Sequence, residues 1–600
     1  MEKYIQPVIQ IDGRRLYYSF LAGARKIIAS QVELNRINVF PVNDGDTGSN
    51  MAATVRSIFD TVRPHRSYNV TMKRIAEAAL TNARGNSGII FAQFLYGLSN
   101  ETVERKTINL HEFSESLRKS VRYIYEAIAN PVEGTMLTVI REWAAYISSQ
   151  RSYSGDFIQM LLNSEKVLSK SLAETKNKLA ILKQSNVVDA GASGFVLFIK
   201  GIIDFIRNSS VRKLLQTKAE SIILPDEMLH IPEEVHLRYC TEAIIQKVTA
   251  DTHSLTQMLS KYGDSVVVAG SDTMKHLHLH TNDPADFFDE LRNFGAITFQ
   301  KADDMVRQSD TMYRRKWKIA LVTDSTCDLS SDLIDQYQIH VLPINIQIGD
   351  NHYLDKLTLQ PIQFYKLMEE GYAYPKTSQI NEKAFINLYS HLASHYDSVI
   401  AVHLTGQFSG TFHNSRKAAT LISQESGRII SVIDSKNLSG ALGLIVLRVA
   451  RSIEAGLPHD QIVEMAENWV RQARIFVSVQ TLKYMVRGGR VSPMKGWIAS
   501  VLNINPIISM DENGKSMIFG KTYSQKSNME KVMQHIRTLV KDGKIWNFIV
   551  LHANNPRAAK WYEDQMRELT GLDAVSVVDI SPVVGANAGI GAASVAFMLD

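Results

Sequence analysis

The chain has 600 residues, of which 45% are apolar and 21% charged, and its formal net charge is +5. This length is too great for one hydrophobic core, so we expect several domains. The apolar fraction excludes a disordered chain. Lys and Arg are interspersed with Asp and Glu, so the charge does not indicate binding to nucleic acid.

Cysteine content and hydropathy indicate the cellular environment. Two cysteines, Cys240 and Cys327, are too few for a disulfide framework, which favours a reducing compartment. The first residues lack the basic and apolar regions of a signal peptide. No apolar run approaches the roughly 18 residues that a spanning helix needs. We therefore expect a soluble, cytoplasmic protein without a transmembrane segment.

The first third of the chain has a helical pattern. From about residue 12 to 210, apolar residues recur at spacings of three and four, which predicts helices. The expected helical segments are 16–30, 52–62, 72–83 and 110–129. Glycine-rich loops separate them.

One of these loops, NVFPVNDGDTGSNM at 38–51, carries Asp44 and Asp46 on either side of a glycine. Two carboxylates on one tight loop suit Mg²⁺, which takes oxygen ligands and keeps phosphate and water oxygens in its shell. The loop leads into an expected helix, whose N-terminus favours an anion. The alternative interpretation is a simple turn with a helix cap.

Three further loops decide between these alternatives. ARGNSG at 83–88, EGTM at 133–136 and VDAGASG at 187–194 combine small and polar residues in the same way. Four such loops in one helical domain favour a shared phosphate site over an isolated turn.

In these loops the sequence resembles the nucleotide-binding domain of dihydroxyacetone kinases, the DhaL type, and more closely the ATP-binding subunit of bacterial fatty acid kinase. The resemblance implies an all-α helical barrel that binds ATP, with Asp44 and Asp46 as catalytic magnesium ligands. Asn43 departs from the family pattern, where proline is expected. The resemblance further implies Asn38 as a third metal ligand, and it places Asp189, Gly191 and Gly194 on a loop that closes near the nucleotide. It assigns the following residues to the nucleotide: Thr47, Gly48, Ser49, Asn50, Ser87, Gly88 and Thr135.

The segment that follows changes to short strand-like runs at 265–269 and 276–280, with a helical run at 284–294, which predicts a small α/β domain. It is similar to the middle domain of the same fatty acid kinase protein. Alternate histidines share one face of a strand, so His278 and His280, with Cys240 from a neighbouring strand, form a candidate zinc site. An HxH strand is also compatible with a plain structural face, and the sequence leaves both interpretations open. If zinc binds here, we expect a structural role.

We expect a basic, weakly structured stretch at 307–318, followed by a domain boundary and a βα pattern with mostly parallel sheets. In such sheets ligands lie at the carboxyl ends of the strands. The expected strands are 319–323, 399–404, 429–433, 546–551 and 574–578, and the expected helices are 364–369, 440–454 and 462–474. In VTDSTCDL at 322–329 we expect Ser325 or Thr326 to cap a helix.

Five motifs in this half resemble the DegV family of fatty-acid-binding proteins over residues 318–600: VTDSTCDL, KTSQI, HLTGQFSGTFHNS, IDSKNLSGALG and LKYMVRGGRVS. The resemblance implies a two-lobed α/β fold that buries an acyl chain and binds its carboxylate with hydroxyl groups. The positions that match are Thr377, Ser378, Ser409, Gly410 and Thr411; the alternative is that these residues only cap helices and close turns. Asn587 stands where the family has histidine, and Arg487 and Arg490 are the nearest candidate cations.

The predicted organisation is a DhaL-like kinase domain at 1–210, a middle α/β domain at 211–315 and a DegV-like domain at 316–600. The expected function is phosphorylation of a bound fatty acid to an acyl phosphate, with ATP and Mg²⁺. The alternatives are phosphotransfer to a small hydroxyl substrate, as in dihydroxyacetone kinases, and a non-catalytic lipid sensor or scaffold. Family resemblance further implies a homodimer and transient contact with a membrane-associated acyltransferase.

Overall fold

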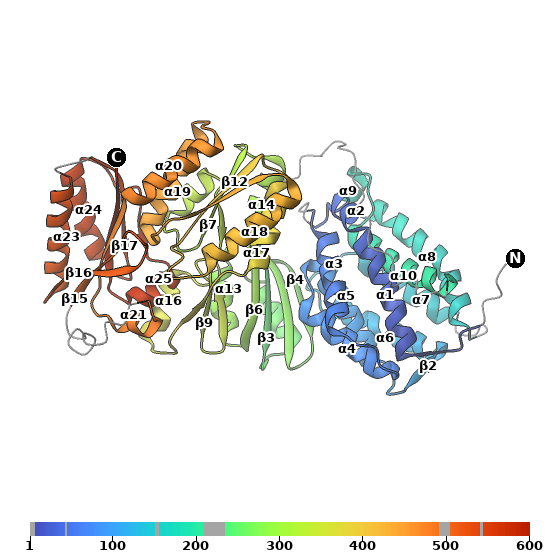
Figure 1. Cartoon of the computed structure of the whole chain (residues 1–600). Helices are drawn as coiled ribbons and strands as arrows, with labels where there is room; N and C mark the ends of the chain where they lie inside the picture. The colour runs from blue at the N-terminus through green and yellow to red at the C-terminus, as the bar shows by residue number, and fades with distance from the viewer. Residues whose placement is uncertain (1–6, 42–44, 151–154, 209–234, 491–504, 541–543) are drawn as a thin grey trace. The chain divides into compact units, whose positions relative to one another are not determined.

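The computed structural model describes residues 7–41, 45–150, 155–208, 235–490, 505–540 and 544–600 (Figure 1). The chain forms two compact units, which are treated separately below. The first unit is Met1–Phe287 with Leu291–Val306, and the second is Phe288–Glu290 with Arg307–Asp600. The expected boundary between residues 210 and 211 lies outside the described residues.

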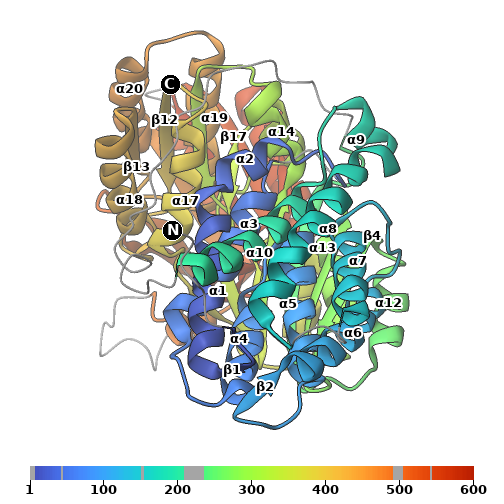
Figure 2. The same ribbon diagram turned by 90° about the vertical axis from the view of Figure 1, so that its right-hand side faces the viewer.

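The first unit begins with a helical domain, as predicted. Its helices are α1 (Gly13–Ala29), α2 (Gln31–Arg36), α3 (Thr47–Thr61), α4 (Tyr68–Asn82), α5 (Gly85–Asn100), α6 (Leu110–Glu126), α7 (Met136–Ser149), α8 (Phe157–Lys178), α9 (Ala180–Gln184) and α10 (Ala190–Asn208) (Figure 2). A short antiparallel pair, β1 (Gln10–Asp12) and β2 (Thr107–Asn109), joins the chain before α1 to the chain before α6.

Local sequence explains where these helices begin and how closely they pack. Asn109 and Glu112 form a reciprocal capping box at the start of α6. Helices α1 and α10 approach closely at Gly201, where a Cβ atom would lie 2.7 Å from the carbonyl oxygen of Ala22. Aromatic side chains fill the core behind this contact, with Phe198 edge-on to both Phe20 and Phe91.

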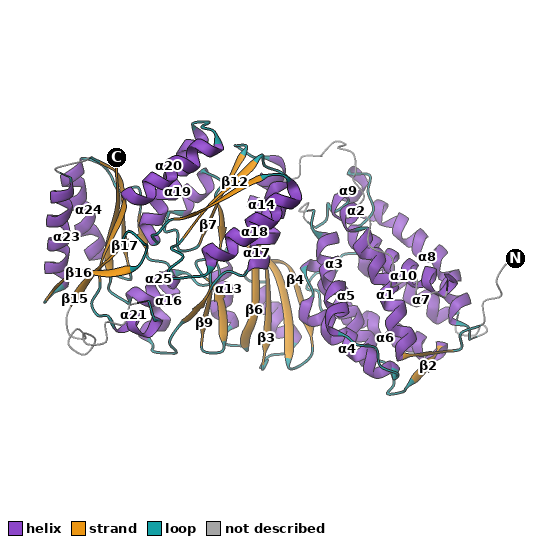
Figure 3. Ribbon diagram, viewed as in Figure 1, coloured by secondary structure: helices purple, strands orange, loops and turns teal. Residues whose placement is uncertain are grey.

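A four-stranded antiparallel sheet completes the first unit, in the order β4-β5-β3-β6 (Figure 3). Its strands are β3 (Tyr239–Gln246), β4 (Gly263–Gly270), β5 (Met274–Thr281) and β6 (Ala296–Asp304), with α12 (Thr252–Leu259) and α13 (Pro284–Leu291) between them. The predicted strands and helix are confirmed here.

This sheet packs directly on the helical domain. At the end of α6, Val268 N donates to Ala127 O at 2.7 Å, and Ala129 N donates to Val266 O at 3.1 Å. Val267 and Ala269 belong to the helical core. One face of the sheet is therefore buried against helices, which brings its polar side chains close to the helical loops.

Most of α14 (Met305–Tyr313) belongs to the second unit, and it occupies most of the stretch expected to be weakly structured, so that prediction was wrong. Arg307 explains the difference, because its side chain is buried and donates to the Asp335 carboxylate at 2.7 Å, a tertiary contact that holds the helix in place. No helix among the described residues combines the length and apolarity needed to cross a bilayer.

The first lobe of this unit contains a parallel sheet in the order β13-β12-β7-β8 and a small antiparallel sheet in the order β10-β9-β11. The strands are β7 (Ile319–Asp324), β8 (His340–Leu342), β9 (Asn345–Ile348), β10 (Asn351–Leu354), β11 (Lys376–Ser378), β12 (Ser398–His403) and β13 (Ile429–Asp434). The helices that alternate with these strands or follow them are α15 (Ser331–Gln336), α16 (Pro361–Glu369), α17 (Glu382–Ala393), α18 (Thr411–Ser426), α19 (Ser439–Glu454) and α20 (His459–Gln472). Of these, α19 also packs on the sheet of the second lobe, where Gly440 lies against the side chains of Leu551 and Ala596.

The second lobe has one sheet in the order β16-β15-β14-β19-β17-β18. Its strands are β14 (Ala473–Ser478), β15 (Asn505–Met510), β16 (Ser516–Thr522), β17 (Ile545–His552), β18 (Val577–Asp579) and β19 (Ala593–Leu599), and its helices are α21 (Lys483–Gly488), α23 (Gln525–Leu539), α24 (Pro556–Thr570) and α25 (Pro582–Ala588). Among the described strands of this lobe only β17 and β18 pair in parallel, so the expectation of mostly parallel sheets was wrong here. An apolar run buried on both faces does not reveal strand direction.

Candidate functional site

A small polar cavity of about 30 Å³ lies in the first unit, between the starts of two helices and two strands of the sheet. The helices α3 and α5 begin at Thr47 and Gly85, and their first backbone N–H groups have no partner within the helix. Such groups, together with the helix dipole, attract anions. The residues that line the cavity are Asn38, Pro41, Asp46, Thr47, Asn50, Gly85, Asn86, Ser87, Cys240, His278 and His280.

The loops that the sequence singles out meet around this cavity. Thr47 Oγ1 donates to Asn38 Oδ1 at 2.9 Å, and both residues are buried. Gly85 has a φ of +60°, and a Cβ atom there would clash with the side-chain amide of Asn50. Glycine is therefore required at this position both by backbone conformation and by close approach.

The loop at 187–194 also contacts these residues, and it is linked to the loop at 133–136. A Cβ atom on Gly191 would lie 2.8 Å from Ser87 Oγ. Asp189 Oδ1 accepts from Ala192 N at 2.7 Å. Burial raises the pKa of Asp189 to about 6, although hydrogen bonds from the backbone N–H groups of Ala192 and Met136 act to lower it. The carboxylate of Asp189 thus links the 187–194 loop to the start of α7.

Seven of the residues that resemblance assigned to the nucleotide or to the loop that closes near it do not line the cavity: Gly48, Ser49, Gly88, Thr135, Asp189, Gly191 and Gly194. Three of them pack helices together instead. Ser49 Oγ accepts from Asn35 at 2.9 Å and from Gln31 at 3.1 Å, and Gly48 faces the Gln31 carbonyl. Gly88 packs on Thr54. Asp44 and Asn43 lie outside the described residues.

A set of sulfur and nitrogen donors faces the same cavity from the sheet. Cys240 on β3 pairs with His280 on β5, and His278 lies two residues earlier on β5. One potential ligand atom from each of these three buried residues lies within 4.8 Å of the others. Neither ring nitrogen of His278 has a hydrogen-bond partner among the described residues. His276 differs, because its Nδ1 contacts Leu80 O at 3.0 Å.

The protonation state of His278 fits a metal site, whereas the Cys240 thiol would have to lose its proton on binding a metal. Burial lowers the pKa of His278 to about 3, with a smaller contribution from His280, so the imidazole is neutral as a metal ligand requires. Burial raises the pKa of the Cys240 thiol well above its usual range, and nearby Asp46 adds to the rise. Cysteine and histidine donors suit zinc, whereas Asp46 and Asn38 offer the oxygens that Mg²⁺ prefers. Sequence reasoning did not place these two donor sets in one cavity.

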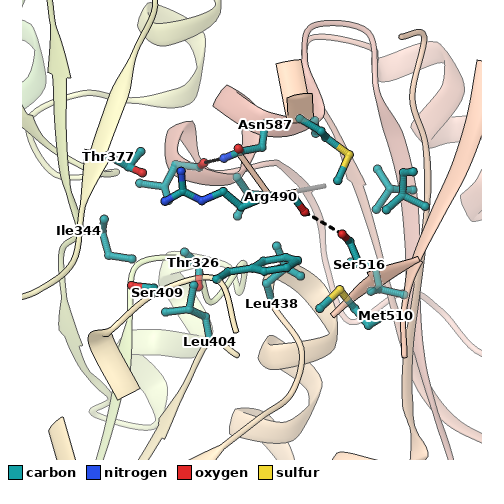
Figure 4. A pocket seen from close by; sticks show the side chains of 18 of the residues that line it. Thr326, Ile344, Thr377, Leu404, Ser409, Leu438, Arg490, Met510, Ser516 and Asn587 are labelled. Atoms are coloured by element: carbon teal, nitrogen blue, oxygen red, sulfur yellow. Dashed lines mark hydrogen bonds between the residues drawn. The ribbon is translucent and has the colours of Figure 1, made fainter. Parts of the chain in front are cut away.

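A larger cavity of about 290 Å³ lies in the second unit (Figure 4). Most of its wall is apolar, with Ile344, Leu404, Leu438, Ile475, Val477, Val479, Ile508 and Met510 among the lining residues. Polar groups join them from several elements: Thr326, Thr377, Ser378, Gln379, Ser409, Ser509, Ser516, Arg490 and Asn587. An apolar cavity with a few convergent polar groups is a typical small-molecule site.

Of the positions assigned to the lipid headgroup, Thr377, Ser378, Ser409, Gly410 and Asn587 line this cavity. Thr411 does not line it, but its Oγ1 lies 2.8 Å from Ser409 Oγ and fixes that hydroxyl.

The two candidate cations lie in different places. Arg490 is the one basic side chain among the described residues that line the cavity, and its guanidinium points toward the wall that carries Thr377 (Figure 4). Arg487 instead lies over the ring of Tyr374, with its guanidinium carbon 5.6 Å from the ring centroid. Asn587 donates to Val583 O at 3.1 Å, which holds its side chain against α25.

A buried network holds Thr326 at the carboxyl ends of β7 and β12. Thr326 Oγ1 donates to Asp324 Oδ1 at 2.5 Å, and Asp324 Oδ2 accepts from Leu404 N at 2.9 Å. The expectation that Ser325 or Thr326 caps a helix was wrong, because α15 begins only at Ser331 and Ser325 Oγ donates to Asp355. A ligand site at the carboxyl ends of parallel strands follows the general rule for α/β sheets.

The fold and the two cavities together define a multidomain protein, with a helical domain and a small sheet in one unit and a two-lobed α/β domain in the other. Family models identify these parts. Residues 41–204 match the DAK2 domain, residues 236–312 match the FakA-like middle domain of fatty acid kinase, and residues 318–600 match the DegV family. The chain thus carries a DhaL-like domain, a FakA-like middle domain and a DegV domain in one polypeptide, which confirms the predicted fusion.

Curated relatives include proteins of Staphylococcus epidermidis, 29% identical, and Staphylococcus saprophyticus, 30% identical, each over 319 residues and each named as uncharacterised. The matches cover 52% of this chain and 58% of each relative, so the chain spans little more than half of their length. Similar solved structures include a fatty-acid-binding DegV-family protein of Thermus thermophilus, which is 25% identical. The match covers 47% of this chain and 100% of that chain, with a TM-score of 0.43. DegV, a fatty acid binding protein of Bacillus subtilis, is 26% identical over 48% of this chain and 100% of that chain, with a TM-score of 0.43.

Proposed function

We propose that the protein phosphorylates the carboxylate of a fatty acid held in the cavity of its second unit, using ATP and Mg²⁺ and releasing an acyl phosphate and ADP. The observation that carries the proposal is the pairing of two sites in one chain. The first unit has a cavity at two helix N-termini lined by oxygen donors, and the second has an apolar cavity with a cluster of hydroxyl groups. The kinase-type domain matches support the same assignment.

In this proposal the first unit binds the phosphates of ATP. The side chains of Thr47, Asn50 and Ser87 line the position of the anion at the starts of α3 and α5. The backbone N–H groups of Ser49 and Gly85 already donate to Asn35 Oδ1 and Glu242 Oε1, so the remaining N–H groups of these first turns would face the phosphates. Asp46 and Asn38, together with Asp44, would hold Mg²⁺. The metal supplies neutralisation of the charge on the transferring phosphoryl group.

The chemistry needs no strong base. A carboxylic acid with an ordinary pKa near 4 is ionised at neutral pH, so its oxygen can attack the γ-phosphorus directly. A bond forms between the carboxylate oxygen and phosphorus, the bond to the bridging oxygen breaks, and the electron pair leaves with ADP. Catalysis is then a matter of positioning and charge neutralisation.

In this proposal the second unit holds the acyl chain of the fatty acid out of water. Each buried methylene contributes about 0.8 kcal/mol, so a long acyl chain strongly favours an apolar cavity over water. Thr377, Ser409 and Arg490 are the groups that we expect to hold the carboxylate. Asn587 can donate one hydrogen bond but carries no charge, unlike the histidine of related proteins.

Zinc is the second metal that the first unit would bind. The donors are Cys240, His278 and His280. A bound zinc ion would hold β3 and β5 together beside the small polar cavity of the first unit, which we call the phosphate cavity. We propose this as a structural role.

A lipid sensor is the second candidate function. It is favoured by Asn587, which donates to Val583 O and carries no positive charge that could pair with the lipid carboxylate. Phosphotransfer to a small hydroxyl substrate is the third. Homodimerisation, contact with an acyltransferase and a cytoplasmic location stay predictions.

Native mass spectrometry of the purified chain before and after addition of ATP and Mg²⁺ tests the proposal. We expect a bound fatty acid that gains the mass of a phosphoryl group. A bound acid that stays unchanged would favour the sensor, and a chain that binds no lipid would contradict the assignment of the second unit.

The substitution Thr377→Val tests the headgroup position. The two side chains have similar shapes, but valine lacks the hydroxyl that faces the cavity. We expect the dissociation constant for a fatty acid to rise about 10- to 150-fold, because a hydrogen bond to a charged group is worth about 1.5–3 kcal/mol. Titration with a fluorescent fatty acid measures the change.

The matched control for this substitution is Thr420→Val, at an exposed threonine of α18 whose hydroxyl donates only to Arg416 O. Equal affinities in the two variants would show that Thr377 does not contact the headgroup.

A further inference from the structure

Glu242 is a buried carboxylate that the proposed chemistry does not use. It lies on β3, two residues from Cys240, and its side chain is inaccessible to solvent. Because alternate residues of a strand share a face, Glu242 and Cys240 point toward the helical domain together. Its neighbours across the sheet are His278 on β5 and Lys301 on β6.

The Glu242 carboxylate contacts the helical domain at Gly85, a residue that lines the phosphate cavity. Gly85 N donates to Glu242 Oε1 at 2.7 Å, across 157 residues of sequence. Gly85 is the first residue of α5, and the next two residues, Asn86 and Ser87, line the cavity. A hydrogen bond from a backbone N–H to a carboxylate is stronger than one between neutral groups. This contact therefore ties the start of α5 to the sheet that carries Cys240.

A charged neighbour compensates the burial of Glu242. Lys301 lies opposite on β6, where its charge favours the ionised carboxylate, and it also forms an ion pair with Asp303. His276 Nε2 lies 3.7 Å from Glu242 Oε2. A buried carboxylate persists only when such partners are present. This arrangement places a fixed negative group behind the loop rather than in the cavity.

We infer that Glu242 is a positioning residue, whose carboxylate holds the start of α5, and with it Ser87, in register with Cys240, His278 and His280 across the cavity. This inference rests on the proposed function, since it assigns the loop at Gly85 to the phosphates of ATP. Displacing a bound substrate by about 1 Å can cost on the order of 100-fold in rate, so a single hydrogen bond at this loop matters for phosphotransfer.

Other contacts keep the sheet on the helical domain without Glu242. Gly270 N donates to Gln93 Oε1 at 3.0 Å, and the residues after α6 pair with β4 through two backbone hydrogen bonds. His276 Nδ1 contacts Leu80 O at 3.0 Å. We therefore expect variants at position 242 to keep the domain arrangement and to change only the loop at Gly85.

Three variants separate the hydrogen bond from the charge. Glu242→Gln keeps an acceptor oxygen at the same reach but removes the charge. Glu242→Asp keeps the charge, but its carboxylate is one methylene too short to reach Gly85 N. Glu242→Ala removes both. We expect the Gln variant to stay close to the wild type, and the Asp and Ala variants to lose about 10- to 100-fold in kcat.

Two measurements are made on the full-length chain with each variant. The first is hydrogen exchange of the peptide that covers residues 83–88, read by mass spectrometry, where we expect faster exchange in Asp and Ala but not in Gln. The second is the kcat and KM for MgATP with a bound fatty acid. Glu77→Ala, at an exposed position of α4, is the matched control.

The inference is tested by how the Gln, Asp and Ala variants rank in activity and in hydrogen exchange. An Asp variant that matches the wild type while the Gln variant loses activity or protection would show that charge, not the hydrogen bond, is required, and would overturn it. Unchanged exchange in the Ala variant would also overturn it. If the wild type transfers no phosphate, the proposed function fails, but the exchange measurement still tests whether Glu242 holds the loop.

Discussion

Asp46→Asn is expected to lower the rate of ATP-dependent phosphotransfer on the order of 10²–10³-fold, because the variant removes a charged oxygen from the cavity that we propose binds the phosphates. The amide keeps the size of the side chain but binds Mg²⁺ less well than a carboxylate. The cavity of the second unit contains no residue from this loop, so the variant should retain its fatty acid. A coupled assay of ADP release, with native mass spectrometry of the bound lipid, measures both quantities.

Asp60→Asn is the matched control, since Asp60 lies near the other end of the same helix and is exposed. It should have wild-type activity. If Asp46→Asn keeps activity within a few-fold of the wild type at low Mg²⁺, then the oxygen donors of this cavity do not bind the catalytic metal. Loss of lipid from the Asp46 variant would instead point to a general folding defect.

The second large effect is expected from Cys240→Ser. The wild-type chain should purify with about one zinc ion, and the variant should bind zinc at least 10- to 100-fold more weakly, which is the cost of removing even an outer-shell partner of a metal site. The reason is that serine does not provide the thiolate that zinc prefers. Plasma mass spectrometry of the dialysed protein gives the metal content, and titration with a zinc indicator gives the affinity.

Cys327→Ser is the control for this substitution, because Cys327 is also a buried free cysteine but lies in the second unit. We expect it to leave the zinc content unchanged. A wild-type protein that neither contains zinc nor binds added zinc would contradict the metal assignment, and the three side chains would then be ordinary buried residues of the sheet.

Much of the fold follows from local patterns in the sequence. The three- and four-residue apolar spacing predicted 110–129, where α6 (Leu110–Glu126) forms, and alternation predicted 276–280, within β5. The capping box of Asn109 and Glu112 marks the start of α6 in the sequence itself. These features depend only on residues close together in the sequence, so they can be predicted without the structure.

Features that depend on distant residues were predicted less well. The helix α14 is held by the contact of Arg307 with Asp335, which no local pattern reveals. The direction of strands in the second lobe depends on β19, from the end of the chain, entering between β14 and β17. A buried strand has the same apolar composition in either direction.

The sequence by itself determined the order of domains, the loops with Asp46, Ser87 and Asp189, and the alternate histidines of β5, because each is a short pattern of residues. Only the tertiary structure decided which of these groups share a cavity. It placed Cys240, His278 and His280 beside Asn38 and Asp46, and it turned Ser49 and Gly88 toward neighbouring helices. It also revealed Glu242, whose partner Gly85 lies 157 residues away. The physical reason is that a site is defined by distances between side chains, and packing of the sheet on the helices sets those distances.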